Sequence, residues 1–191
     1  MDKKITIHSL PVWARLLHAF STLANTLHMK GTSLVEALIV LVMLLNKTDG
    51  HIILADDDEE DQELFKDAVQ EIEPKIKISA ANNGDELMRL LLKDAIVPDV
   101  IFLDLNMPFK NGQECLAEIR SNEKLKSIPV IIYTTSNNKK HIDDTYSSGA
   151  DYYISKPNSF KDLKLIIKKM LSREWNTHTQ PIKEQFVVSA N

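Results

Sequence analysis

Three acidic residues follow two apolar segments, where their carboxylates could bind a cation. In "VIFLDLNMP" (100–108), four apolar residues lead to Asp104, and a proline soon ends the extended run. In "LADDDEED" (54–61), Asp56 and Asp57 directly follow another apolar run. Carboxylates within about 4–6 Å of one another repel, which raises the pKa of each unless a cation is present. Because oxygen ligands suit Mg²⁺ or Mn²⁺, the three acids predict a divalent metal site.

Two further residues offer what a phosphoryl group needs. Thr134 ends the apolar segment "VIIYT", and Lys156 ends "YYISK". A hydroxyl and a cation are the usual means of holding phosphoryl oxygens. We therefore interpret this pair as functional, although either residue alone would indicate only a turn or a solvated side chain.

The acids that follow Asp57 have a structural interpretation. Asp58 has the spacing of a helix N-cap, and Glu59, Glu60 and Asp61 would fall in the first turn, where acids complement the helix dipole. We assign these four residues to helix capping.

The elements that must position these residues alternate along the chain from His51 onward. Apolar runs of strand length alternate with stretches of helical period, which is typical of βαβ units and a doubly wound parallel sheet. In such a sheet the first and third strands are neighbours, so Asp56, Asp57 and Asp104 would meet at one edge. The α/β fold that we expect has five strands, at 52–55, 77–81, 100–104, 130–134 and 152–156.

Composition limits the kinds of partner. The net charge of −4 and the pI near 5.9 give no reason to expect nucleic-acid binding, which needs clustered Lys and Arg. The single cysteine, Cys115, cannot form an internal disulfide, which fits a reducing compartment and a cytoplasmic location.

The chain changes character near residue 50. Residues 1–50 carry five basic and three acidic residues, whereas 51–191 carry 18 and 24, so we treat 1–50 as an extension. Residues 51–171 would form the domain, and 172–191 an irregular tail.

The extension contains "TSLVEALIVLVMLL" (32–45), which is shorter than the roughly 20 residues needed to cross a bilayer, so no transmembrane span is expected. Three interpretations stay open for it. It could be a membrane-peripheral or partner-binding helix, or a prepilin-like leader cleaved after Gly31 in "KGTSLVE". It could also be sequence upstream of a true start at Met43.

Taken together, the motifs resemble the receiver domain of two-component response regulators over about 51–171. They are the pair Asp56-Asp57, "DLNMP" followed by Gly112, "PVIIYT", and "GADYYISKP". The resemblance implies a flavodoxin-like (βα)5 fold with strand order 2-1-3-4-5. It also implies that Asp104 is the phosphoacceptor.

The same resemblance implies roles for the other site residues. Asp57 and Asp104 would coordinate Mg²⁺ with the backbone carbonyl of Asn106, and Asp56 would act through a metal-bound water. Thr134 and Lys156 would hold the phosphoryl oxygens. Tyr153 would be the aromatic residue whose rotamer reports phosphorylation, and the Lys156–Pro157 peptide would be cis.

The function that follows is a stand-alone switch. Its partner upstream would be a sensor histidine kinase or a histidine phosphotransfer protein, and its output would be contacts with a downstream protein, with a homodimer left open. It would not be an enzyme beyond its self-catalysed phosphorylation and dephosphorylation. Two alternatives stay open: a phosphorylation-independent interaction module, and a Mg²⁺-dependent aspartyl phosphohydrolase. Against the second, Asn106 stands where haloacid-dehalogenase-type phosphatases have another acid.

Overall fold

The computed structural model describes residues 50–191 except 95, 174, 176–179 and 191. The interpretations of the N-terminal extension therefore fall outside the described residues and stay predictions. Within the described part of the chain, no helix is both long and apolar enough to cross a membrane.

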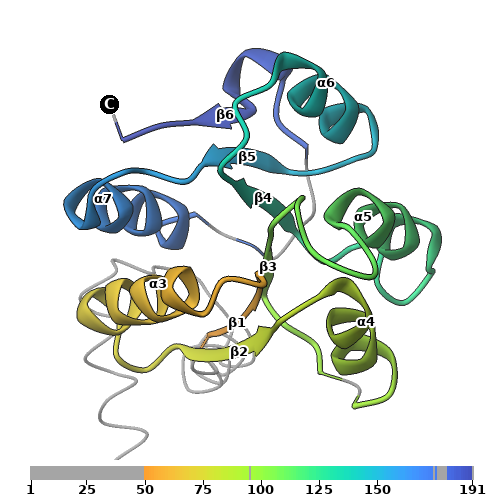
Figure 1. Cartoon of the computed structure of the whole chain (residues 1–191), viewed down its shortest axis with the longest axis horizontal. Coiled ribbons are helices and arrows are strands. Elements are labelled where there is room, and N and C mark those ends of the chain that lie inside the picture. The colour runs from red at the N-terminus through yellow and green to blue at the C-terminus, as the bar shows by residue number, and fades with distance from the viewer. Residues whose placement is uncertain (1–49, 95, 174, 176–179, 191) are drawn as a thin grey trace, which may run out of the picture. The chain divides into compact units, whose positions relative to one another are not determined.

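A single parallel sheet organises this part of the chain (Figure 1). Its order is β2-β1-β3-β4-β5-β6, which confirms the predicted order and adds one strand. The strands are β1 (His51–Ala55), β2 (Lys77–Ala81), β3 (Val100–Leu103), β4 (Val130–Thr134), β5 (Tyr152–Ser155) and β6 (Val187–Val188). The three central strands β1, β3 and β4 are almost wholly buried, as a sheet covered on both faces requires.

Helices cover both faces of the sheet. On one face lie α3 and α7, and the ring of Phe65 in α3 meets those of Phe102 in β3 and Tyr133 in β4 edge to face. On the other face α4, α5 and α6 pack over a second apolar core. The helices are α3 (Glu59–Ile72), α4 (Gly84–Leu92), α5 (Gly112–Ser121), α6 (Lys139–Ser147) and α7 (Phe160–Leu171).

Backbone hydrogen bonds carry the sheet as far as the residues predicted to do chemistry. The amide of Asp56 donates to Ala81 O (2.9 Å), that of Asp104 to Ala55 O (2.9 Å), and that of Lys156 to Thr134 O (2.8 Å). Asp104 and Lys156 lie one residue beyond the ends of β3 and β5, not inside them as predicted. These bonds fix the backbone from which each side chain projects, while leaving the side chain at the sheet edge.

The C-terminal tail differs from its prediction as an irregular segment. A 3₁₀ turn, η2 (Lys183–Gln185), leads into β6, which pairs in parallel with β5. The Tyr153 amide donates to Phe186 O (2.9 Å), and the Phe186 ring is fully buried against the rings of Tyr146 and Tyr153. A strand of two residues is stable here because one aromatic side chain anchors it.

We predict that Phe186→Ala lowers the free energy of unfolding by about 3–5 kcal/mol, the usual cost of removing a buried phenylalanine. Val187→Ala is the matched control, because the neighbouring Val187 is 48% exposed. Denaturant unfolding of the full chain measures both. Equal, small losses in the two variants would show that the tail does not pack as described.

Candidate functional site

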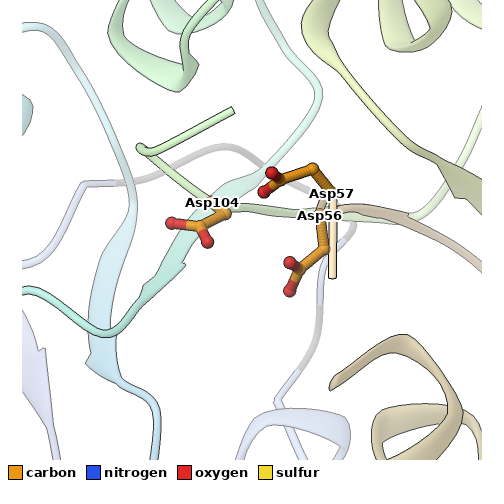
Figure 2. A group of neighbouring side chains, drawn as sticks. All are labelled: Asp56, Asp57 and Asp104. Carbon is orange, nitrogen blue, oxygen red and sulfur yellow. The ribbon is translucent and has the colours of Figure 1, made fainter. Parts of the chain in front are cut away.

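Three carboxylates meet at the carboxyl edge of the sheet. Asp56 and Asp57 follow β1, Asp104 follows β3, and these two strands are neighbours. Asp56 and Asp104 are buried, whereas Asp57 is exposed. One oxygen from each residue lies within 4.8 Å of the others. Figure 2 shows the three side chains as neighbours at the strand ends, and their distances confirm the predicted convergence.

The local backbone around Asp104 is fixed by the loop that follows. The Asn106 amide donates to Asp104 Oδ1 (3.2 Å). Gly112, which begins α5, passes so close that a β-carbon there would lie 2.1 Å from the Asp104 carbonyl oxygen. Only glycine fits at this position, because any side chain would push the loop away from Asp104.

Lys156 reaches into this cluster from the end of β5. Its ammonium lies 2.7 Å from Asp56 Oδ2, 2.8 Å from Asp61 Oδ2 and 3.1 Å from Asp104 Oδ2. Its side chain is 7% exposed. The sequence led us to expect Lys156 on phosphoryl oxygens; in this structure it is the internal cation that partly neutralises the acids.

Burial of these charges shows most clearly in the raised pKa of Asp56. Burial raises the pKa of Asp56 from an ordinary value of 3.8 to about 6, although the Lys156 ammonium opposes the rise. Asp56 Oδ2 pairs with Lys156 by charge but has no hydrogen bond of normal geometry. A buried, incompletely satisfied carboxylate oxygen beside two other carboxylates is a set of donors that fits a divalent cation.

A buried glutamine holds the backbone of Asp56. Gln62 Nε2 donates to Asp56 O (2.7 Å) and to Asn82 Oδ1 (2.7 Å). The chain between β1 and α3 is thereby tied to the residue after β2. Gln62 was not singled out in the sequence, where it is one more polar residue of an amphipathic helix.

The other two predicted residues are Thr134, at the end of β4, and Tyr153, within β5. Thr134 is fully buried, and its Oγ1 accepts from the Ser136 amide at 3.4 Å. Tyr153 is also fully buried, and its hydroxyl donates to Ser136 O at 2.9 Å. The segment after β4 therefore links the two residues through Ser136, which sequence reasoning missed.

One expectation at this edge is incomplete and another is wrong. Asp61 lies in the first turn of α3 as expected and Asp58 provides the side-chain cap, but the Asp61 carboxylate also binds Lys156. Asp58 and Asp61 are three residues apart at the start of α3. Their spacing alone could not show that the Asp61 side chain reaches a residue outside the helix. The Lys156–Pro157 bond is not cis, since the described residues contain no cis peptide; trans is the favoured isomer even before proline.

We predict a pH-dependent difference in stability between wild type and Asp56→Asn in the presence of EDTA. A raised carboxyl pKa means that the folded state binds the proton more tightly than the unfolded state does. The protonated Asp56 carboxyl therefore contributes to the free energy of unfolding in full below about pH 4, and this contribution is lost as the pH rises through about 6. The asparagine variant avoids the buried charge. Its advantage should grow by about 3 kcal/mol from pH 4 to 7, since each tenfold change in proton affinity corresponds to about 1.4 kcal/mol.

Chemical denaturation at several pH values measures the difference. Asp67→Asn, an exposed position of α3, is the control and should show no such trend. An advantage of Asp56→Asn that does not change with pH would contradict the assignment of the raised pKa.

Comparisons with known proteins agree with this geometry. Response regulator Rcp1 of Synechocystis sp. is 31% identical over 135 residues, which cover 68% of this chain and 92% of Rcp1. The crystal structure of the Mn²⁺-bound form of Rcp1 matches with a TM-score of 0.61, over 69% of this chain and 99% of that chain. The structure of the phosphorylated cyanobacterial phytochrome response regulator RcpA, 34% identical, matches with a TM-score of 0.62 over 69% and 98%.

A similar segment also occurs inside a larger protein. The sensor histidine kinase CheAY of Helicobacter pylori is 29% identical over 130 residues, which cover 68% of this chain and 16% of CheAY. The family described as the response regulator receiver domain matches residues 52–168. With the parallel sheet and the acidic edge in place, this match identifies the chain as a member of the response regulator receiver domain family.

Proposed function

We propose that this chain is a stand-alone response regulator that accepts a phosphoryl group on Asp104. The observation that carries the proposal is the position of Asp104: a buried carboxylate beside two other acids and the Lys156 ammonium. The RcpA structure is that of a phosphorylated response regulator, which supports the same chemistry here. The donor would be a sensor histidine kinase or a histidine phosphotransfer protein, and a histidine kinase is among the proteins that carry a similar segment.

Mg²⁺ is the metal that we propose for the acidic edge, with Mn²⁺ as a substitute, because a Mn²⁺-bound form of Rcp1 is known. Asp57 and Asp104 would bind it directly with the backbone carbonyl of Asn106, and Asp56 through a water. The three carboxylate oxygens within 4.8 Å of one another fit such an ion. When bound, the metal supplies positive charge for the carboxylates and for the transferred phosphoryl group.

In the proposed reaction, an oxygen of Asp104 attacks phosphorus of the donor phosphohistidine. A bond forms between that oxygen and phosphorus, the bond from phosphorus to the histidine nitrogen breaks, and the nitrogen keeps the electron pair. Lys156 and Thr134 hold the phosphoryl oxygens. The sheet contributes position, because the Asp104 and Lys156 amides are tied to neighbouring strands.

The output would run through the face formed by α6 and β5. Phosphoryl oxygens on Asp104 would draw the Thr134 hydroxyl inward, and Ser136 links Thr134 to the Tyr153 hydroxyl. Tyr153 in turn packs against Phe186 of the tail. A shift of Tyr153 between two positions would thus change the surface offered to a downstream protein or to a second copy of this chain.

We predict that acetyl phosphate with Mg²⁺ adds one phosphoryl group to the wild-type chain and none to Asp104→Asn, because the attacking oxygen is replaced by an amide. Intact-mass spectrometry measures this directly. Asp67→Asn, which removes an exposed acid from α3, should label as wild type does. Undiminished labelling of Asp104→Asn would contradict the assignment, and a wild-type chain that accepts nothing from any donor would favour the interaction module.

We also predict that Asp57→Asn weakens Mg²⁺ binding by at least about tenfold, because one of only a few protein ligands is lost. Isothermal titration calorimetry of the metal-free chain measures the dissociation constant. Glu63→Gln, an exposed acid on α3, controls for the general loss of one negative charge. Equal affinities in the two variants would remove Asp57 from the metal site.

A further inference from the structure

Among the described residues, Asp61 is the one carboxylate paired with Lys156 that the proposed chemistry does not use. The Lys156 ammonium has three carboxylates around it, and they differ in depth. The side chains of Asp56 and Asp104 are 0% and 6% exposed, whereas that of Asp61 is 33% exposed. Asp61 therefore holds the ammonium from the solvent side, and Asp56 and Asp104 hold it from within.

The fold does not need this carboxylate in order to begin α3. Asp58 Oδ1 already accepts from the amides of Glu60 (2.9 Å) and Asp61 (3.2 Å), which caps the helix. The Asp61 carboxylate is therefore not needed for the cap. It instead accepts a hydrogen bond from the Lys156 ammonium, beyond the end of β5, at 2.8 Å.

The position of the ammonium matters because Lys156 and a bound metal ion would share the same carboxylates. Asp104 Oδ2 and Asp56 Oδ2 both pair with Lys156 in this structure. An ion bound to these carboxylates would weaken their pairing with the ammonium, which at 7% exposure has little water to take their place. A carboxylate that stays paired with the ammonium while the metal binds lowers the free-energy cost of metal binding, because the buried ammonium is not left without a partner.

We propose that Asp61 is a positioning residue, which gives Lys156 a partner on the solvent side that it keeps when Asp56 and Asp104 bind the metal. The proposal rests on the proposed function only for one consequence, namely that Lys156 stays in place to bind the phosphoryl oxygens. Without Asp61 the ammonium would have only Asp56 and Asp104 as carboxylate partners and would compete with the metal for them. Metal binding and phosphorylation would then both be impeded.

The test is a double-mutant cycle on Mg²⁺ affinity, measured by calorimetry on the full chain without any phosphodonor. Asp61→Asn should raise the dissociation constant about tenfold, the lower end of what loss of an outer-shell partner costs a metal site. Glu60→Gln removes the same charge from the same helical turn and should raise it no more than about twofold, as for other exposed charges. Asp61→Glu, which keeps the carboxylate, should fall between wild type and Asp61→Asn.

The Lys156→Met background separates positioning from simple charge. If Asp61 acts through Lys156, the effect of Asp61→Asn shrinks in that background to the size of the Glu60→Gln effect. If Asp61 only attracts the metal by its charge, removing the neighbouring ammonium unmasks that charge, and the effect stays or grows. The second result overturns the proposal, as does a wild-type affinity in Asp61→Asn.

Labelling by acetyl phosphate then distinguishes this inference from the proposed function. Asp61→Asn should accept the phosphoryl group on Asp104 several-fold more slowly than Glu60→Gln under subsaturating Mg²⁺. Coupling in the metal cycle with no labelling of the wild-type chain would sustain the positioning role and reject the phosphoacceptor. Labelling of Asp61→Asn at the rate of Glu60→Gln would reject the consequence drawn for Lys156.

Discussion

One ammonium group among several carboxylates holds the functional edge of this domain together. Lys156 joins the end of β5 to the acids that follow β1 and β3 and to the first turn of α3. Burying these charges is costly, and the raised pKa of Asp56 is a direct sign of that cost. The pairing with Lys156 offsets only part of it, since four acids face a single base. The cluster of carboxylates therefore fits a further cation, and in the proposed function phosphoryl oxygens become the partners of Lys156.

The sheet fixes the backbone at the residues for which chemistry is proposed. Asp56, Asp104 and Lys156 are each tied by their amides to a neighbouring strand. Gly112 lets α5 begin close against the Asp104 backbone. The polar chain from Thr134 through Ser136 to Tyr153 then leads away from the site to the tail, where Phe186 packs. The structure thus links Thr134, at the end of β4, to the tail beside β5, and in the proposed function this link carries the change at Asp104 to the surface formed by α6, β5 and β6.

Sequence reasoning succeeded where the signal repeats and failed where contacts are long-range. Alternating strand and helix periods predicted the five main strands and their meeting edge, because each element carries its own pattern. The strand at Val187–Val188 was missed, since two residues cannot show a period and only the burial of Phe186 explains it. The contact of Asp61 with Lys156 was missed, because a first-turn acid near a helix start has the same local pattern whether or not it reaches a lysine 95 positions away. The sequence placed Lys156 at the same sheet edge as Asp56, Asp57 and Asp104 but did not show that its ammonium pairs with two of them.

The central claim is that Asp104, and no other carboxylate of the cluster, carries the phosphoryl group. Borohydride reduces an acyl phosphate to an alcohol, so it converts a phosphorylated aspartate to homoserine and leaves free carboxylates unchanged. After phosphorylation with acetyl phosphate and Mg²⁺, reduction and peptide mass spectrometry should find homoserine at position 104. Homoserine at position 56 or 57 would contradict the claim, and so would its absence from a chain whose intact mass shows a phosphoryl group.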